Sequence, residues 1–244
     1  MGQERICCPH STDAIHYAAK YLCACGFDVT PSPDMDITHL LLPVPTFPAA
    51  EVFLSDTLSI LPPNVQISGG NLEERLNRYQ VVDFLKDPYY LAENAAITAR
   101  CAIEIVERRH SASLSGCSIL IVGWGRIGKC LSYFLGRIGA TVTVAARKDA
   151  DRAMIRALGF QDTSIADAAS QLKKYQVILN TVPVMVLPDM ATRPDTIILE
   201  LASKPGMSGA NIIDARGLPS KMAPEASGKL IAETFIRLSL GKEV

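Results

Sequence analysis

Residues 118–128 read S-I-L-I-V-G-W-G-R-I-G, a run of strand formers that leads directly into three glycines with G-x-G-x-x-G spacing. In such a turn the first glycine allows the tight bend, and the second lets a diphosphate approach the backbone. The third glycine lets the following helix pack against the strand. The diphosphate is expected at the helix N-terminus, where free N–H groups and the helix dipole favour anions. A glycine-rich turn without a ligand is the alternative. The residues predicted to bind a dinucleotide cofactor here are Gly123, Trp124, Gly125, Arg126, Ile127 and Gly128.

The end of the next strand decides which dinucleotide fits. That strand reads T-V-T-V-A-A-R-K and ends in Arg147 and Lys148, with no acid before Asp149. An NAD-specific site places an acid there to accept hydrogen bonds from the ribose, and this acid repels the 2′-phosphate of NADP. Arginine instead accommodates that phosphate through bidentate contacts. The two cations therefore favour NADP, and a pair of solvated surface charges is the alternative.

Two loops further along the chain are predicted to reach the same edge of the sheet. Asn180, Thr181, Val182 and Pro183 follow a buried strand, and ligands of open α/β sheets bind at the carboxyl ends of the strands. We predict that this loop binds the cofactor, although Asn and Pro are also ordinary turn residues. Lys204 leaves the next strand at the same edge, where it holds a substrate carboxylate or the cofactor, or is simply solvated.

Hydrophobic periodicity indicates an α/β protein with two Rossmann-like lobes. The front lobe is predicted to span residues 1–110, with the C-terminal helix 224–244 packed on it. Residues 111–223 are predicted to form an NADP-binding Rossmann domain, a doubly wound parallel sheet with the G-x-G-x-x-G turn. The predicted strands are 5–8, 27–30, 38–42, 65–68, 118–122, 141–145, 176–180, 196–200 and 211–213. The predicted helices are 12–25, 90–109, 127–138, 149–158 and one from Pro224 onward.

The composition fits a globular protein and excludes several classes. Of 244 residues, 48% are hydrophobic and 20% charged, and the net charge of −1 gives no basic stripe for nucleic acid. No apolar run approaches the roughly 20 residues that span a bilayer, and the start has no secretory apolar core. Seven cysteines, an odd number, suit a reducing compartment, so we expect a cytoplasmic protein. Cys23 and Cys25 have no second ligand pair, so no metal site is predicted and buried thiols are expected.

Three later motifs make the sequence recognisable. N-T-V-P, then L-A-S-K-P-G, then G-L-P-S-K-M-A-P-E-A-S-G follow the glycine turn in this order. An L-P-V loop, a Ser-Gly turn and a helix bearing Glu93 precede it. In these features the chain resembles the A subunits of dipicolinate synthase, an NADP-binding Rossmann family related to the D-2-hydroxy-acid dehydrogenases. The sequence departs from the family at Lys204, where arginine is frequent.

The resemblance implies a function. It implies an enzyme component that binds NADP(H) and helps to oxidise a dihydrodipicolinate-type precursor to pyridine-2,6-dicarboxylate in spore-forming bacteria. It also implies a partner, the smaller and flavoprotein-like B subunit of dipicolinate synthase. We expect a homo-oligomer, and no contact with nucleic acid or membrane.

Oxidation of a dihydropyridine removes a hydride and a proton, so the site requires a modest base. Glu93, at the start of a helix with an apolar inner side, is the candidate, although an acid in a first helical turn is also favoured by the dipole. Lys204 is the second catalytic candidate. For the second carboxylate of the substrate, successive N–H groups of Ser68, Gly69 and Gly70 are predicted to form an anion nest.

Two other functions stay open. The D-2-hydroxy-acid dehydrogenases use a histidine beyond the nucleotide lobe, and this sequence has no histidine after residue 110. Another dehydrogenase of that general type is therefore a weaker alternative. The lack of a convincing acid–base pair favours a different class, a non-catalytic NADPH-binding sensor that regulates a partner.

Overall fold

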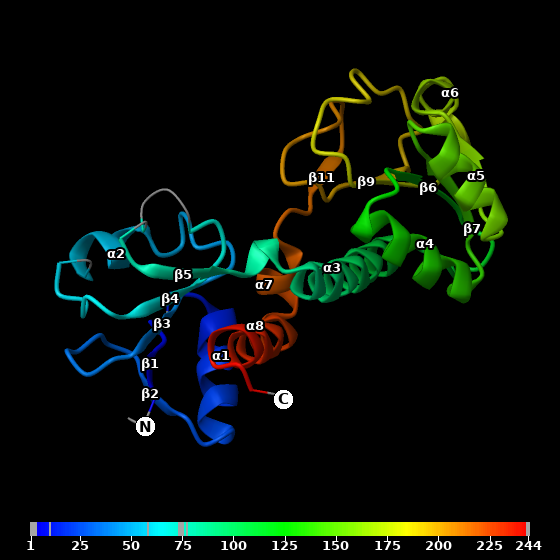
Figure 1. Cartoon of the computed structure of the whole chain (residues 1–244). Helices are drawn as coiled ribbons and strands as arrows, with labels where there is room; N and C mark the ends of the chain where they lie inside the picture. The colour runs from blue at the N-terminus through cyan, green and yellow to red at the C-terminus, as the bar shows by residue number, and fades with distance from the viewer. Residues whose placement is uncertain (1–3, 10, 58, 73–75, 77, 243–244) are drawn as a thin grey trace. The chain divides into compact units, whose positions relative to one another are not determined.

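The computed structural model describes residues 4–242 apart from 10, 58, 73–75 and 77. Its contacts divide the chain into two compact units, called here the front lobe and the nucleotide lobe (Figure 1). The front lobe comprises Met1–Asn94 and Pro219–Val244, and the nucleotide lobe comprises Ala95–Leu218. The first division falls inside helix α3 (Pro88–Arg109), whereas the sequence predicted it after the helix. Apolar residues such as Val106, in the second half of α3, are buried and belong to the nucleotide lobe.

The front lobe is built on a five-stranded parallel sheet with the order β2-β1-β3-β4-β5. Its strands are β1 (Arg5–Cys7), β2 (Asp28–Thr30), β3 (His39–Leu41), β4 (Gln66–Gly69) and β5 (Gln80–Asp83). Its helices are α1 (Asp13–Ala24), α2 (Glu51–Thr57), the short η1 (Phe84–Lys86), the start of α3, most of α7 (Leu218–Met222), and α8 (Pro224–Ser239). The sequence analysis did not predict β5 or α2.

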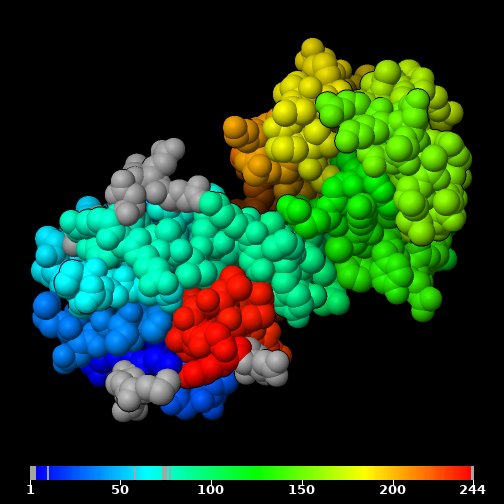
Figure 2. Space-filling model, in the orientation of Figure 1, coloured from blue at the N-terminus to red at the C-terminus, as the bar shows by residue number. Residues whose placement is uncertain are grey.

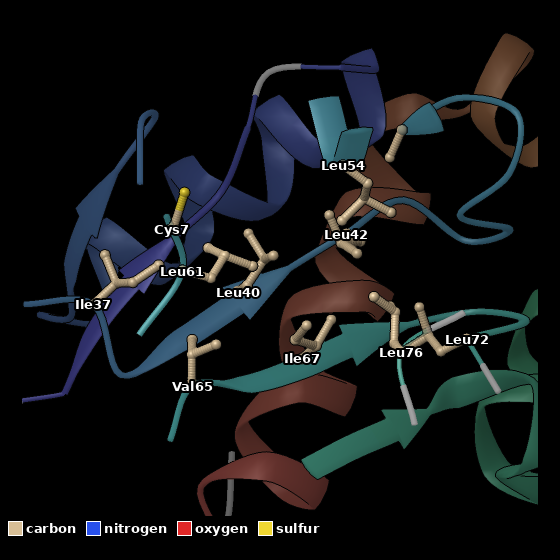
Figure 3. Packing of buried hydrophobic residues seen from close by; sticks show 11 residues of the cluster. Cys7, Ile37, Leu40, Leu42, Leu54, Leu61, Val65, Ile67, Leu72 and Leu76 are labelled. Atoms are coloured by element: carbon tan, nitrogen blue, oxygen red, sulfur yellow. The ribbon is translucent and has the colours of Figure 1, made fainter. Parts of the chain in front are cut away.

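Figure 3 shows the core on one face of this sheet. Leu40 of β3 and Ile67 of β4 are fully buried and pack in one cluster with Leu54 of α2. The central strands β1 and β3 are covered on both faces, which explains the apolar runs Ile6–Cys8 and Leu40–Leu42.

Helix α8 returns to the front lobe and packs on α1. A Cβ placed on Gly228 would lie 2.4 Å from the carbonyl oxygen of Ala14, so the two helices cross closely because residue 228 is glycine. The Tyr21 hydroxyl donates to Glu233 Oε1 at 3.1 Å. Figure 2 shows α8, in red, as part of the front lobe's surface.

Asp87 anchors the beginning of α3 within this lobe. Its carboxylate accepts the Tyr90 N–H at 2.8 Å and pairs with Arg237 of α8. Burial of Asp87 raises the pKa of its carboxyl, but the hydrogen bonds from Arg237 and Tyr90 outweigh it and leave the pKa below its ordinary value. The carboxylate therefore stays ionised and holds two helix ends together.

The nucleotide lobe contains a six-stranded parallel sheet with the order β11-β10-β9-β6-β7-β8. If these strands are renumbered 1 to 6 in chain order and the sheet is read from the β8 edge, the order is 3-2-1-4-5-6. This is the doubly wound Rossmann order. The structure thus confirms the predicted fold class. The strands are β6 (Ser118–Val122), β7 (Thr141–Ala145), β8 (Gln161–Thr163), β9 (Val177–Asn180), β10 (Ile197–Glu200) and β11 (Ile212–Asp214). The other elements are α4 (Arg126–Ile138), α5 (Asp149–Ala157), α6 (Ile165–Ala169) and η2 (Leu172–Lys174).

The cysteines correct one expectation. Cys7, Cys8, Cys101 and Cys117 are buried, but Cys23 and Cys25 are exposed at the end of α1. Residue 22 is the last on the buried face of that helix, so the next turn carries its side chains toward solvent. None of the helices in the described part of the chain is long and apolar enough to cross a membrane.

Candidate dinucleotide site

The glycine turn lies where the strand order of the sheet reverses. The chain runs from β6 to β7 on one side, and β9 joins β6 on the other, so the carboxyl ends of β6 and β9 flank the position where ligands of such sheets bind. Gly123 directly follows β6 and has a φ of +106°, a conformation that residues with side chains rarely adopt. A Cβ there would lie 2.5 Å from Thr181 Oγ1, on the loop after β9. Only glycine lets the two strand ends approach this closely.

Gly128 allows α4 to pack against the turn. A Cβ at this position would lie 2.2 Å from the backbone oxygen of Gly123, far inside van der Waals contact. The helix can therefore begin directly beneath the strand end.

This contact gives a prediction for stability. The Gly128→Ala substitution is expected to lower the free energy of unfolding by about 1–3 kcal/mol or more, because backbone rather than a flexible side chain must move. Urea unfolding followed by circular dichroism measures the change. The matched control is Gly125→Ala, where nothing lies within 4 Å of the added Cβ. Equal free energies of unfolding for the two variants would show that the backbone at Gly123 moves aside without loss of stability.

Gly125 is the open position of the turn. It is the N-cap of α4, is exposed, and provides no side-chain cap for the N–H groups of the first helical turn. Among the described residues, apart from Gly125 and its chain neighbours, no atom lies within 4 Å of an ideal Cβ at this position. An uncapped helix N-terminus with room for a ligand is where a diphosphate binds. The residues present therefore fit a dinucleotide.

The side chains between the glycines surround this opening. Trp124 is half-buried, and the Lys129 ammonium lies 5.8 Å from the centre of its ring. Arg126 is exposed and Ile127 is half-buried. These three positions remain predicted cofactor contacts.

The end of β7 carries cations and no acid. Ala145 and Ala146 are buried, and Arg147 and Lys148 are exposed directly after them. Arg152 joins them from inside α5: its guanidinium donates to the carbonyl oxygens of Ala146 and Arg147, each at 3.2 Å. Arg152 was not predicted from the sequence, because its contact depends on the first turn of α5 folding back toward the strand end.

The loop after β9 is held by its own side chains. Asn180 is fully buried, and its Oδ1 accepts the Val182 N–H at 3.0 Å. The Thr181 hydroxyl donates to the carbonyl oxygen of Val122 at 2.8 Å, next to the glycine turn. Pro183 is exposed. Asn180 is therefore engaged within the protein, whereas Thr181, Val182 and Pro183 line the loop beside the turn.

Glu200 is the second residue that the sequence analysis missed. It ends β10 directly opposite Asn180, is 4% exposed, and accepts a hydrogen bond from Asn180 Nδ2 at 2.7 Å. A signal was present in the sequence, since an acid at the end of an apolar strand is rarely buried without partners.

The predicted substrate and catalytic residues are distributed over both lobes. Glu93 is exposed on α3 in the front lobe, and Lys204 is exposed on the loop after β10 in the nucleotide lobe. Ser68, Gly69 and Gly70 are buried, and the Gly70 N–H donates to Thr46 Oγ1 at 3.1 Å. That N–H is thus occupied within the lobe. Substrate binding by these residues stays a prediction.

A glycine turn at the switch point of a doubly wound parallel sheet defines the class: a protein with the fold of the Rossmann dehydrogenases. No protein-family model matches the chain. In sequence it is similar to the A subunit of dipicolinate synthase from Bacillus subtilis, with 28% identity over 156 residues, 59% of this chain and 52% of that protein. The chain thus spans, in this match, about half the length of the curated relative. The resemblance seen in the motifs is confirmed.

Solved structures share the fold over nearly the whole chain. The A subunit of dipicolinate synthase from Bacillus halodurans matches with a TM-score of 0.80 and 20% identity, over 97% of this chain and 99% of that one. A transhydrogenase from Sinorhizobium meliloti matches with a TM-score of 0.70 and 12% identity, over 90% and 79%. An L-alanine dehydrogenase matches with a TM-score of 0.64 and 10% identity, over 91% and 76%.

Proposed function

We propose that the protein is the NADP(H)-binding component of a cytoplasmic, two-component oxidoreductase that forms pyridine-2,6-dicarboxylate from a dihydrodipicolinate-type precursor. The observation that carries this proposal is the open, uncapped N-terminus of α4 at the switch point of the sheet. Similarity to the A subunit of dipicolinate synthase supports the substrate class. The fold shared with a transhydrogenase and an alanine dehydrogenase supports a nicotinamide cofactor.

The end of β7 supports NADP in particular. When bound, the nicotinamide accepts or donates the hydride. The N–H groups after Gly125 hold the diphosphate, and Arg147 and Lys148 hold the 2′-phosphate. Arg152 donates hydrogen bonds to the carbonyl groups of Ala146 and Arg147 and is itself paired with Asp149 and Asp162. An acid in place of these cations would repel the phosphate.

The substrate carries two carboxylates, so two anion-binding elements are required. Lys204, exposed beside the loops at the switch point, binds one of them in this proposal. The segment Ser68–Gly70 of the front lobe is the predicted element for the other, and its Gly70 N–H would have to leave Thr46 Oγ1 to bind an anion. Glu93 is the proposed base that takes the proton released as the ring becomes aromatic.

The relative is named as one subunit of its enzyme, which supports a second protein component here. We propose that this component is a flavoprotein-like B subunit in a spore-forming bacterium, and that the chain forms a homo-oligomer. Purification of the chain with a candidate B subunit, followed by a dihydrodipicolinate oxidation assay with and without that partner, tests the proposal. Nucleotide binding without turnover in either assay would favour the sensor instead.

Lys204 provides a prediction for the reaction. The Lys204→Ala substitution is expected to lower kcat/KM for the dihydro substrate by about ten-fold, since a charged contact to a carboxylate is lost. The Kd for NADPH should change by less than about two-fold, because in this proposal the exposed Lys204 contacts the substrate and not the diphosphate or the 2′-phosphate. Steady-state kinetics and calorimetry measure the two effects. The control is Lys173→Ala, at an exposed position of η2 in the same lobe. Unchanged kinetics for Lys204→Ala would show that Lys204 is an ordinary solvated surface residue.

One observation favours the sensor as a second candidate. Glu93 and Lys204 are exposed, and Asn180 is fully engaged within the nucleotide lobe. Neither catalytic candidate, Glu93 or Lys204, is held in the buried setting in which catalytic acids and bases are usually tuned. A module that binds NADPH and passes its redox state to a partner requires no such pair.

A further inference from the structure

We propose that Glu200 is a positioning residue that fixes both loops beside the nucleotide, so that the affinity for any dinucleotide depends on it. The inference about affinity rests on the proposed nucleotide-binding function. The inference about the loops stands on the contacts of Glu200 alone.

The carboxylate of Glu200 joins the ends of two neighbouring strands. Its Oε1 accepts from Asn180 Nδ2 at 2.7 Å and from the Ala202 N–H at 3.1 Å. Its Oε2 accepts from the Gly206 N–H at 2.8 Å. Glu200 therefore fixes the turn from residue 202 to residue 206 and is also hydrogen-bonded to Asn180 at the end of β9.

Asn180 passes this constraint toward the glycine turn. Its amide nitrogen bonds both Glu200 and the carbonyl oxygen of Val182, and its amide oxygen accepts the Val182 N–H. Val182 in turn lies against Gly123, where an added Cβ would be 2.8 Å from Val182 Cγ2. A continuous set of contacts thus connects the buried carboxylate to the turn that binds the diphosphate.

The two loops are also packed directly on each other. The Val186 N–H donates to the carbonyl oxygen of Gly206 at 2.8 Å, and Leu187 and Met207 form an isolated parallel β-bridge. A Cβ on Gly206 would lie 2.3 Å from the carbonyl oxygen of Val182 and 2.5 Å from Asn180 Nδ2. The glycine at 206 is what lets its N–H reach the carboxylate.

Only a carboxylate satisfies this arrangement. All three partners of Glu200 are donors, and an ionised carboxyl group is the side chain that only accepts. None of these three hydrogen-bond donors is a cation, and the positive charge of Arg216 interacts electrostatically with the Glu200 carboxylate. Burying such a group costs free energy unless every donor is aligned. We infer that this cost is retained because the acid fixes the loops after β9 and β10, which lie beside the proposed nucleotide site.

The Glu200→Gln substitution tests the proposal. The glutamine keeps the shape but turns an NH₂ group toward a backbone N–H, so one buried donor is left unpaired. We expect the Kd values for NADPH and NADH to rise by the same factor, about ten-fold. The ratio between the two cofactors should not change, because Glu200 acts on the loops and not on the 2′-phosphate. The matched control is Glu107→Gln, an exposed glutamate on α3 in the same lobe.

Hydrogen exchange supplies a readout that does not depend on nucleotide. In Glu200→Gln, amide exchange should accelerate at Val182, Ala202 and Gly206, whereas the strands of the same sheet stay protected. A wild-type protein that binds neither nucleotide would overturn the proposed function, and this exchange pattern would still decide the inference about the loops. Unchanged exchange at the three amides, or unchanged affinity at a temperature where the variant is folded, would overturn the role of Glu200.

A second substitution covers the case in which Glu200→Gln does not fold. Asn180→Ala removes the connection to Val182 but leaves the Ala202 and Gly206 contacts of Glu200 in place. It is expected to weaken both nucleotides to a similar extent. Wild-type affinity for both nucleotides in Asn180→Ala would contradict the proposal that Asn180 links Glu200 to Val182 and the glycine turn.

Discussion

The Gly125→Val substitution is expected to abolish NADPH binding, with a loss of at least about 100-fold, while the protein stays folded. The branched side chain would fill the space in which the diphosphate approaches the N-terminus of α4. The fold should tolerate the change, because Gly125 has an ordinary φ of −79° and no atom lies within 4 Å of the added Cβ. Calorimetric titration measures the binding, and urea unfolding measures the stability.

The Gly125→Ala variant is the control for this experiment. Its smaller side chain should give an intermediate loss of affinity, which would follow from steric exclusion and not from a changed backbone. Normal NADPH binding by Gly125→Val would mean that the glycine turn does not hold the cofactor.

The Arg147→Asp substitution is expected to remove the preference for NADPH over NADH. It deletes a cation beside the 2′-phosphate and introduces a charge of the same sign as the phosphate. Because Arg147 is exposed, solvent screens part of this effect, and we expect the affinity for NADPH to fall by at least about ten-fold. NADH, which lacks the phosphate, should bind at least as tightly as before.

Lys173→Asp gives the matched control, since it makes the same charge change at an exposed position of η2 in the same lobe. It should leave the ratio of the two affinities unaltered. Parallel titrations at two salt concentrations would show whether the Arg147 effect is electrostatic, because screening weakens only the charged contact. An equal fall in NADH affinity would assign Arg147 to the fold of the turn instead.

The fold was largely predictable because its central strands are apolar and its glycine turn is specific. The runs that became β6 and β9 are buried except for Ser118, so their sequences are almost entirely apolar and carry a strong signal. By contrast, β8 consists of the three residues Gln161–Thr163 at a sheet edge, where polar side chains are permitted. Short α2, in a segment rich in prolines, was missed for a similar reason. Local pattern alone does not distinguish such elements from loops.

The candidate site was predictable only where backbone geometry dictates the residue. Gly123 and Gly128 are required by contacts that a glycine pattern encodes. Arg152 and Glu200 act through partners brought together by the tertiary fold, so spacing along the chain did not reveal them. The exposed thiols at Cys23 and Cys25 were predicted wrongly, since the helix pattern did not show where its buried face ends.

The central claim is that the protein binds NADP(H) at the turn between β6 and α4, and the sequence provides its own reporter. The chain has a single tryptophan, Trp124, which lies within that turn. Titration of the wild-type protein with NADPH and with NADH, followed by tryptophan fluorescence, therefore observes the site directly. We predict saturable quenching by both cofactors, at a lower concentration for NADPH. Fluorescence that neither cofactor changes, or quenching at an equal or lower concentration of NADH, would contradict it.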